Sequence, residues 1–120
     1  RGTANGRRVF VATHRLPGRP DGGAVDAEGC YWMAAVDGGC LMSFAADGGL
    51  LSTWAVPVEK PSKAAFGGAG LSTLFVTSLR RNLNRPIDAQ PHAGGLFAFQ
   101  PGTRGIALPD CAIATRASVG

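Results

Sequence analysis

An internal repeat with a period of slightly more than 40 residues is the feature that most constrains the fold of this chain. Residues 20–25 (PDGGAV) align with residues 61–66 (PSKAAF) at an offset of 41, and residues 31–34 (YWMA) align with residues 74–77 (LFVT) at an offset of 43. A period of about 40 to 45 residues is typical of a β-propeller, in which each repeat forms one blade of four short antiparallel strands. The repeat therefore predicts an all-β propeller fold.

Short β-rich runs separated by turn residues agree with this prediction. The first run, residues 8–13 (RVFVAT), is expected to be the outer strand of one blade. A second blade of four strands and a third of three are then predicted at residues 23–26, 30–35, 40–45, 50–56, 63–66, 72–78 and 95–100. The sequence thus predicts a single domain over residues 1–120, a partial propeller of about two and a half blades. A small β-sandwich or barrel that closes on itself is the alternative.

The longest stretch without a strand pattern is residues 79–94. It contains three arginines, two asparagines and two prolines. Loops longer than about 12 residues are uncommon in compact domains and are often functional. We therefore predict a long loop here and regard it as a candidate functional segment.

Charge and cysteine content exclude several classes of protein. The net charge is +4, but the arginines form no run: the only adjacent ones are two isolated pairs, Arg7–Arg8 and Arg80–Arg81, with no interleaved aromatic residues. This argues against nucleic-acid binding. No apolar stretch approaches about 18 residues, so we expect no membrane partner. The three cysteines include no CxxC pair, which argues against a disulfide framework and a zinc cluster. A cytoplasmic location is the resulting expectation.

The segment over residues 18–34 carries the most informative motif. A PDG triplet, a few apolar residues, D-x-E-G and an aromatic-rich strand follow one another in it. This order resembles a hallmark of the regucalcin/gluconolactonase family, which includes senescence marker protein and luciferin-regenerating enzyme. Further pieces resemble later segments of the same family, in order: FGG at 66–68, LFVTS at 74–78, GGLF at 94–97 and PGTRG at 101–105. The similarity covers residues 7–108 and corresponds to the C-terminal portion of the family.

The resemblance implies a six-bladed propeller that binds one divalent metal ion and hydrolyses sugar lactones. The metal would be calcium or zinc, with magnesium and manganese as further options. Of the metal ligands of the family, only the aspartate of the PDG motif has a counterpart in this sequence, which is Asp21. The resemblance therefore implies that Asp21 is both a metal ligand and a catalytic residue. The glutamate and asparagine ligands of the family are expected upstream of residue 1.

The chemistry of a carboxylate suits that role for Asp21. Carboxylate oxygens are ligands that calcium and zinc accept, and a bound metal would polarise a lactone carbonyl and lower the pKa of a bound water. The carboxylate could also act as general base on that water. The alternative is that Pro20-Asp21-Gly22 is only a turn, because all three residue types favour turns.

The other polar candidates are weaker. Four acidic residues, Asp26, Glu28, Asp37 and Asp47, flank or precede glycines and are predicted to be turn residues. The two histidines have no partner at a metal-ligand spacing; they are His14 and His92. We expect three large aromatic residues to belong to the core: Trp32, Trp54 and Phe66.

Two functional hypotheses follow. The first is a metal-dependent hydrolase of sugar lactones in which this chain carries only part of the active site, so that activity depends on completion of the propeller by a missing N-terminal segment or by a second copy of the chain. The second is a non-catalytic propeller fragment that acts as a self-associating or partner-binding module.

Overall fold

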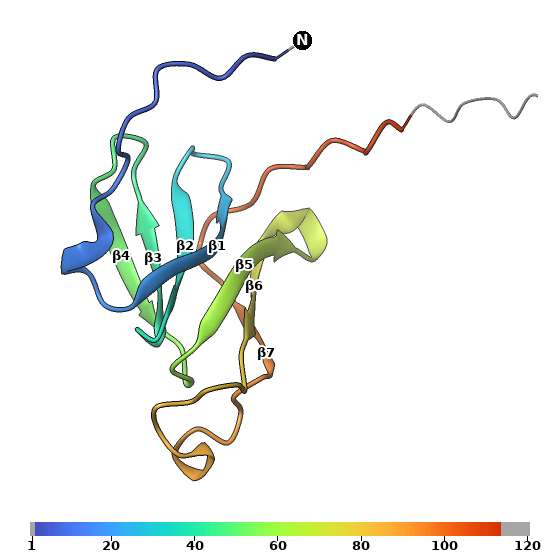
Figure 1. Ribbon diagram of the computed structural model, residues 1–120. Coiled ribbons are helices and arrows are strands. Elements are labelled where there is room, and N and C mark those ends of the chain that lie inside the picture. Colours follow the sequence, from blue (N-terminus) through green and yellow to red (C-terminus); the bar gives the residue numbers. More distant parts are fainter. Residues whose placement is uncertain (1, 114–120) are drawn as a thin grey trace, which may run out of the picture.

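The computed structural model describes residues 2–113, which form two antiparallel sheets (Figure 1). The first sheet has four strands in sequence order: β1 (Arg19–Val25), β2 (Tyr31–Val36), β3 (Cys40–Phe44) and β4 (Leu50–Ala55). The second has three: β5 (Pro61–Gly67), β6 (Thr73–Ser78) and β7 (Leu96–Phe99). Residue 1 and residues 114–120, which belong to the predicted domain, lie outside the described residues.

The connections between these strands contain only short helical turns. Three 3-10 helices of three residues each are present: η1 (Thr13–Arg15), η2 (Ala69–Leu71) and η3 (Ile87–Ala89). Within residues 2–113 there is no helix long and apolar enough to cross a membrane. The sequential meander within each sheet is the arrangement of a propeller blade, and the prediction of an all-β partial propeller is confirmed.

Tight turns explain why each strand pairs with the next one along the chain. The β2–β3 turn contains Asp37 in the left-handed region at φ 69°, and the β3–β4 turn contains Gly48 at φ 95°. Asp47 supports the second turn, because its Oδ1 accepts a hydrogen bond of 2.9 Å from the Gly49 amide. Residues that tolerate a positive φ, such as glycine and aspartate, are the ones that such turns require.

The four-stranded sheet has an apolar core on each of its faces. Alternation along β2 sends Trp32 and Ala34 into a cluster between the two sheets, and sends Met33 and Ala35 into a second cluster on the far face. A sheet that is apolar on both faces requires a neighbour on each, as a propeller blade has. A two-layer sandwich would need only one apolar face, so this burial pattern argues against that alternative.

The three large aromatic residues predicted for the core do pack there. Trp32 is buried, and its ring contacts those of Trp54 and Phe66, each at a centroid distance of 6.2 Å. Trp54 also contacts Phe99 of β7 in an edge-to-face arrangement at 6.5 Å. Such pairs contribute about 0.5–1.5 kcal/mol each beyond the burial of their surface. They fix the first sheet against the second.

The prediction of a strand at residues 8–13 is wrong. None of its residues is paired in a sheet, Thr13 is the first residue of η1, and Val9 is 78% exposed. Phe10 anchors it to the far face of the first sheet through edge-to-face contacts with Tyr31 (6.1 Å) and Phe44 (6.5 Å). A β-strand requires a partner that takes up its backbone hydrogen bonds, and none of the described strands pairs with this segment. Its β-rich composition therefore serves packing rather than pairing.

Candidate functional site

Asp21 lies within β1, at a break in the pairing of that strand with β2. Pro20 is opposite Ala35 and Gly23 is opposite Met33. Between these two pairs the chain advances three residues on β1 but only two on β2. This is a β-bulge, which inserts one extra residue and re-aims the side chains around it. The triplet that begins at Pro20 is thus part of a strand rather than a turn, and β1 begins earlier than the sequence pattern predicted.

The innermost strand of the second sheet has a matching bulge. Pro61 is opposite Ser78 and Lys63 is opposite Thr77, which leaves Ser62 as the extra residue. Ser62 is therefore the counterpart of Asp21 in the repeat, and its Oγ lies 2.9 Å from the Thr77 Oγ1. Both bulges follow a proline, which has no amide hydrogen to donate and is confined to edge strands and bulges.

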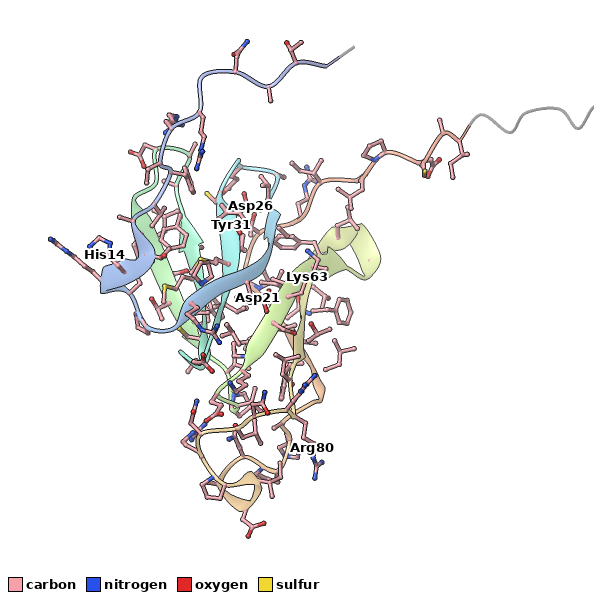
Figure 2. All side chains as sticks on the ribbon, viewed as in Figure 1. His14, Asp21, Asp26, Tyr31, Lys63 and Arg80 are labelled. Carbon is pink, nitrogen blue, oxygen red and sulfur yellow. The ribbon has the colours of Figure 1, made fainter. Side chains whose placement is uncertain are left out.

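β1 and β5 are the edge strands of their sheets and lie side by side (Figure 1). The Lys63 Nζ donates a hydrogen bond of 3.0 Å to the carbonyl oxygen of Gly23, which links the two strands directly. In a propeller the first strand of each blade is the innermost one and lines the central channel. Asp21 and Lys63 thus both lie on the innermost strands (Figure 2).

The Asp21 side chain is exposed, and among residues 2–113 it forms no ion pair and no hydrogen bond. Its two carboxylate oxygens are therefore available as hard donors of the kind that calcium and zinc bind. A calcium ion takes about six to eight oxygen ligands, however, and zinc usually takes four. Asp21 fits one position of such a set, and among the described residues it belongs to no group of three or more acidic, histidine or cysteine ligands.

A different group of metal-type ligands occurs at the β1–β2 turn, where one atom each of Asp26, Glu28 and Cys30 lie within 4.8 Å of one another. The buried Asp26 carboxylate already accepts hydrogen bonds of 2.9 Å from the amides of Glu28 and Cys30 and from the Trp32 indole. Burial, together with the nearby Asp26 and Glu28 charges, raises the pKa of the Cys30 thiol, which disfavours the thiolate that a metal would require. This group closes the turn, as predicted for Asp26 and Glu28.

Asp37 links three segments: the β2–β3 turn to which it belongs, the start of β1 and the residue before β5. Its Oδ2 accepts two hydrogen bonds from Arg19 (2.9 Å from Nε and 2.6 Å from Nη2), and its Oδ1 accepts one of 2.5 Å from the buried Lys60. The hydrogen bonds from Lys60 and Arg19 lower the pKa of the Asp37 carboxyl. Because Arg19 is two residues before Asp21, this cluster holds the strand that carries the candidate ligand.

Glu59 and Gln90 hold the loop over residues 79–94 against the sheets. The Glu59 carboxylate accepts hydrogen bonds from the amides of Asn84 (2.5 Å) and Arg85 (3.0 Å). Gln90 is fully buried; its side chain accepts from the Glu59 amide (3.0 Å) and donates to the Arg85 carbonyl (2.9 Å). Burial raises the pKa of the Glu59 carboxyl, but the hydrogen bonds from Asn84, Arg85 and Gln90 outweigh it, and the net effect is a lowered pKa.

No pattern in the sequence indicated these two clusters. Asp37 and Lys60 are 23 residues apart, and Glu59 and Gln90 are 31 residues apart, so no local spacing connects them. The histidines take no part in either cluster: His14 lies in η1 and His92 in the loop over residues 79–94. Figure 2 shows His14 well away from Asp21.

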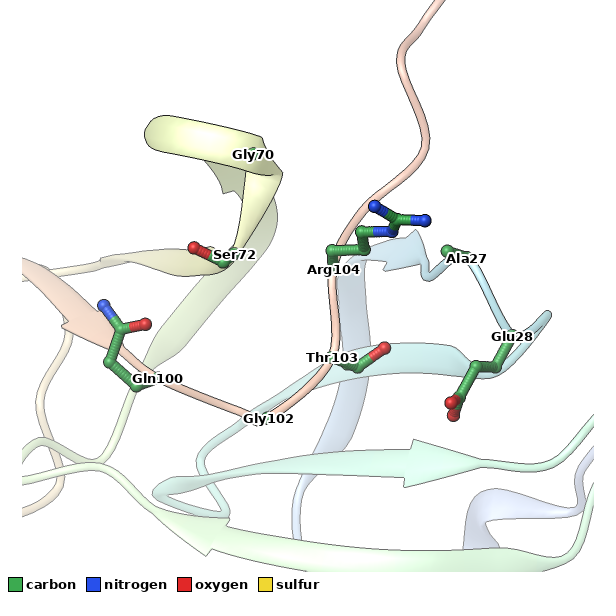
Figure 3. Close-up of a pocket in the computed structure, with 8 residues that line it drawn as sticks. All are labelled: Ala27, Glu28, Gly70, Ser72, Gln100, Gly102, Thr103 and Arg104. Carbon is green, nitrogen blue, oxygen red and sulfur yellow. The ribbon is translucent and has the colours of Figure 1, made fainter.

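A hollow lies at the other end of β1. It has a volume of about 640 Å³ and is bordered by the β1–β2 turn, η2 and the segment that follows β7 (Figure 3). Its polar side chains are Glu28, Ser72, Gln100, Thr103 and Arg104. Asp21 is not among its lining residues, so this hollow is separate from the candidate metal ligand.

Comparisons with known proteins place these observations in one family. The profile of the SMP-30/Gluconolactonase/LRE-like region matches residues 1–80. A 6-deoxy-6-sulfogluconolactonase from Pseudomonas putida is 42% identical over 93 residues, which cover 77% of this chain and 32% of that protein. Regucalcin from Gallus gallus is 33% identical over 108 residues, which cover 88% of this chain and 36% of that protein.

Two solved structures have the same arrangement of strands. A calcium-binding regucalcin from Agrobacterium tumefaciens superposes with a TM-score of 0.79 at 32% identity, over 85% of this chain and 35% of that one. A luciferin-regenerating enzyme superposes with a TM-score of 0.72 at 28% identity, over 83% of this chain and 34% of that one. The chain spans about a third of the length of the relatives it matches. With its blade-type repeat, its two sheets and the match over residues 1–80, the chain belongs to the SMP-30/gluconolactonase/LRE-like family.

Proposed function

We propose that this chain is part of a metal-dependent hydrolase of sugar lactones, in which Asp21 binds the metal and takes part in catalysis. The observation that carries the proposal is the exposed Asp21 carboxylate on the bulge of β1, an innermost strand, without a partner among the described residues. Relatives whose names specify sugar lactones support the substrate class: a 6-deoxy-6-sulfogluconolactonase and a pentonolactonase from Haloferax volcanii.

The metal would be calcium or zinc, with magnesium and manganese as further options. A bound divalent ion supplies polarisation of the lactone carbonyl and a lower pKa for a coordinated water. Asp21 would hold the ion through one carboxylate oxygen and could accept a proton from the attacking water through the other. The Asp37 cluster would keep β1 in register while this occurs, because it fixes Arg19 on the same strand.

The remaining ligands would come from outside the described residues, either from a segment that precedes this sequence or from a second copy of the chain. The relatives are about three times as long as the region that they share with this chain, so they contain further residues that could supply such ligands. A cytoplasmic location is part of the proposal and is supported by the three free cysteines, Cys30, Cys40 and Cys111.

The test measures hydrolysis of a panel of aldonolactones by pH-stat titration, with and without added calcium or zinc. We expect metal-dependent turnover in the native protein and a loss of at least about 100-fold in Asp21→Asn, the scale on which a positioned acid–base group contributes. Asp47→Asn is the matched control, because it removes one carboxylate charge and can keep the turn hydrogen bond to Gly49. Equal turnover in both variants would rule out the role of Asp21.

A second candidate function is a non-catalytic, self-associating module. It is supported by the edge of β7, which pairs only with β6 among the described strands and carries Leu96 at 65% exposure. An unpaired strand edge is a template for pairing with another chain. Folded protein that associates through this edge and turns over no lactone with any metal would favour this candidate over the hydrolase.

A further inference from the structure

The side chain of Lys63 is held in a defined position against Gly22 and Gly23, the two residues that follow Asp21. Its stem lies against Gly22, the residue that follows Asp21: a Cβ built on Gly22 would be 2.8 Å from both the Cβ and the Cγ of Lys63. Its Nζ donates to the Gly23 carbonyl across the gap between β5 and β1 at 3.0 Å. A glycine at position 22 is therefore required for this approach, because any larger side chain would displace the lysine.

The charge on this lysine is not neutralised within the described part of the chain. None of the carboxylates among residues 2–113 forms an ion pair with Lys63, although Asp37 and Glu59 each pair with other cations. An ammonium group has three N–H donors, and the Gly23 carbonyl takes one of them. Two N–H donors thus remain available on an exposed side chain that contacts β1 at the residues following the candidate metal ligand.

We propose that Lys63 determines substrate specificity by binding an anionic substituent of the lactone, a phosphate or a sulfonate. This inference rests on the proposed function, because it places the substituent beside the metal held by Asp21. A lysine is a point charge that suits a tetrahedral oxyanion, and such charge-assisted hydrogen bonds are about twice as strong as neutral ones. With a neutral lactone, the remaining N–H donors of Lys63 would form hydrogen bonds to water instead.

A purely structural role for Lys63 makes a different prediction. If the hydrogen bond to Gly23 only joined β5 to β1, removal of the charge would lower stability without changing which ligand is preferred. The variant Lys63→Met keeps the length of the stem and removes the charge, and Lys63→Arg keeps the charge. Arg15→Gln is the matched control, because it removes one positive charge from an exposed residue in η1.

The experiment has a binding readout and a kinetic one. Calorimetry measures the affinity of the protein for gluconate, 6-phosphogluconate and 6-deoxy-6-sulfogluconate, and pH-stat titration measures kcat and KM for neutral gluconolactone. We expect the native protein to bind at least one of the two anionic sugar acids about tenfold more tightly than gluconate, a preference that salt weakens. Whichever of the two anionic sugar acids binds more tightly identifies the preferred substituent, phosphate or sulfonate.

The variants decide the role of the lysine. We expect the preference to vanish in Lys63→Met and to persist in Lys63→Arg and Arg15→Gln, and turnover of neutral gluconolactone by Arg15→Gln to stay within about twofold of the native value. A native protein without the preference, or a preference that survives in Lys63→Met, would overturn the proposal. If the native protein does not hydrolyse neutral gluconolactone, this result contradicts the proposed hydrolase function instead. The binding measurement would still decide the role of Lys63.

Discussion

Three aspartates of the first sheet and its turns differ in what their carboxylates contact. Asp21 is exposed on a bulge without a partner among residues 2–113, Asp26 is buried with three N–H donors, and Asp37 is paired with two cations. A carboxylate whose oxygens are already satisfied stabilises the fold, whereas one with available oxygens can bind a ligand. Contacts, rather than position in the sequence, separate the candidate ligand from the structural residues.

Substitution of Asp26 should destabilise the fold. Asp26→Ala removes the acceptor for the Glu28 and Cys30 amides and for the Trp32 indole, and each buried donor that is left unsatisfied costs about 1–3 kcal/mol. We expect a loss of about 3 kcal/mol in the free energy of unfolding. Urea titration followed by tryptophan fluorescence measures it, with Asp47→Ala as an exposed control. A loss similar to that of the control would contradict the structural role of Asp26.

The Asp37 cluster predicts a pH dependence of stability. The pKa of Asp37 is lower in the folded chain than in the unfolded one, so its contribution is present above the unfolded pKa of about 3.9 and is lost as the pH falls through the folded pKa. The native protein should therefore be more stable than Asp37→Asn near neutral pH, and the difference should shrink below about pH 4. Unfolding curves from about pH 7 to about pH 3 measure this. A difference that stays constant over this range would contradict it.

At the scale of elements, the strands were predictable and their register was not. Turn residues such as Asp47 and Gly48 mark the ends of adjacent strands, and six of the seven observed strands begin within one or two residues of their predicted positions; β1 begins at Arg19 rather than at residue 23. The bulge at Asp21 was missed because pairing register depends on two strands at once. The prolines that precede both bulges, Pro20 and Pro61, were the signal in the sequence that could have indicated them.

The error at residues 8–13 has a related cause. A β-rich composition shows which residues can be extended, but a strand forms only where another strand is in place to pair with it. The clusters around Asp37 and Glu59 were missed because their partners are distant in the sequence. The family motif indicated Asp21 as the candidate ligand, but its exposure and lack of partners required the structure.

The loop over residues 79–94 is predicted to be held in place by Gln90. Because Gln90 links the Glu59 amide to the Arg85 carbonyl, Gln90→Ala should release the loop. We expect trypsin to cleave after the exposed Arg80 and Arg81 at least about tenfold faster in this variant, which corresponds to about 1.4 kcal/mol of local stability. Mass spectrometry of timed digests locates the cuts, and Gln100→Ala is an exposed control. Equal cleavage rates would show that Gln90 does not hold the loop.

At the scale of the whole molecule, the chain has an unpaired edge at β7 and exposed apolar side chains on other segments. β7 pairs only with β6 among the described strands, and Leu96, Ile106 and Leu108 are exposed. In a closed propeller every blade packs between two others, so surfaces of this kind are covered by neighbouring blades. The same surfaces explain why the chain alone would tend to associate.

Association through β7 has a direct test. We expect light scattering to show concentration-dependent association of the 120-residue chain, and Leu96→Lys to shift it toward the monomer, because a lysine on a strand edge opposes pairing. Leu51→Lys, an exposed position on β4, is the control for added charge. A chain that is monomeric at all concentrations would contradict the role of this edge.

The most direct test of the central claim is a graft. The corresponding third of the Pseudomonas putida 6-deoxy-6-sulfogluconolactonase is replaced by residues 7–108 of this chain, and metal-dependent lactone hydrolysis is measured. If Asp21 is the metal ligand of a lactonase-type propeller, the graft should keep metal-dependent turnover, lose at least about 100-fold of it in Asp21→Asn, and keep it in Asp47→Asn. A folded graft whose turnover survives Asp21→Asn, or that has none while the unmodified relative is active, would contradict the claim.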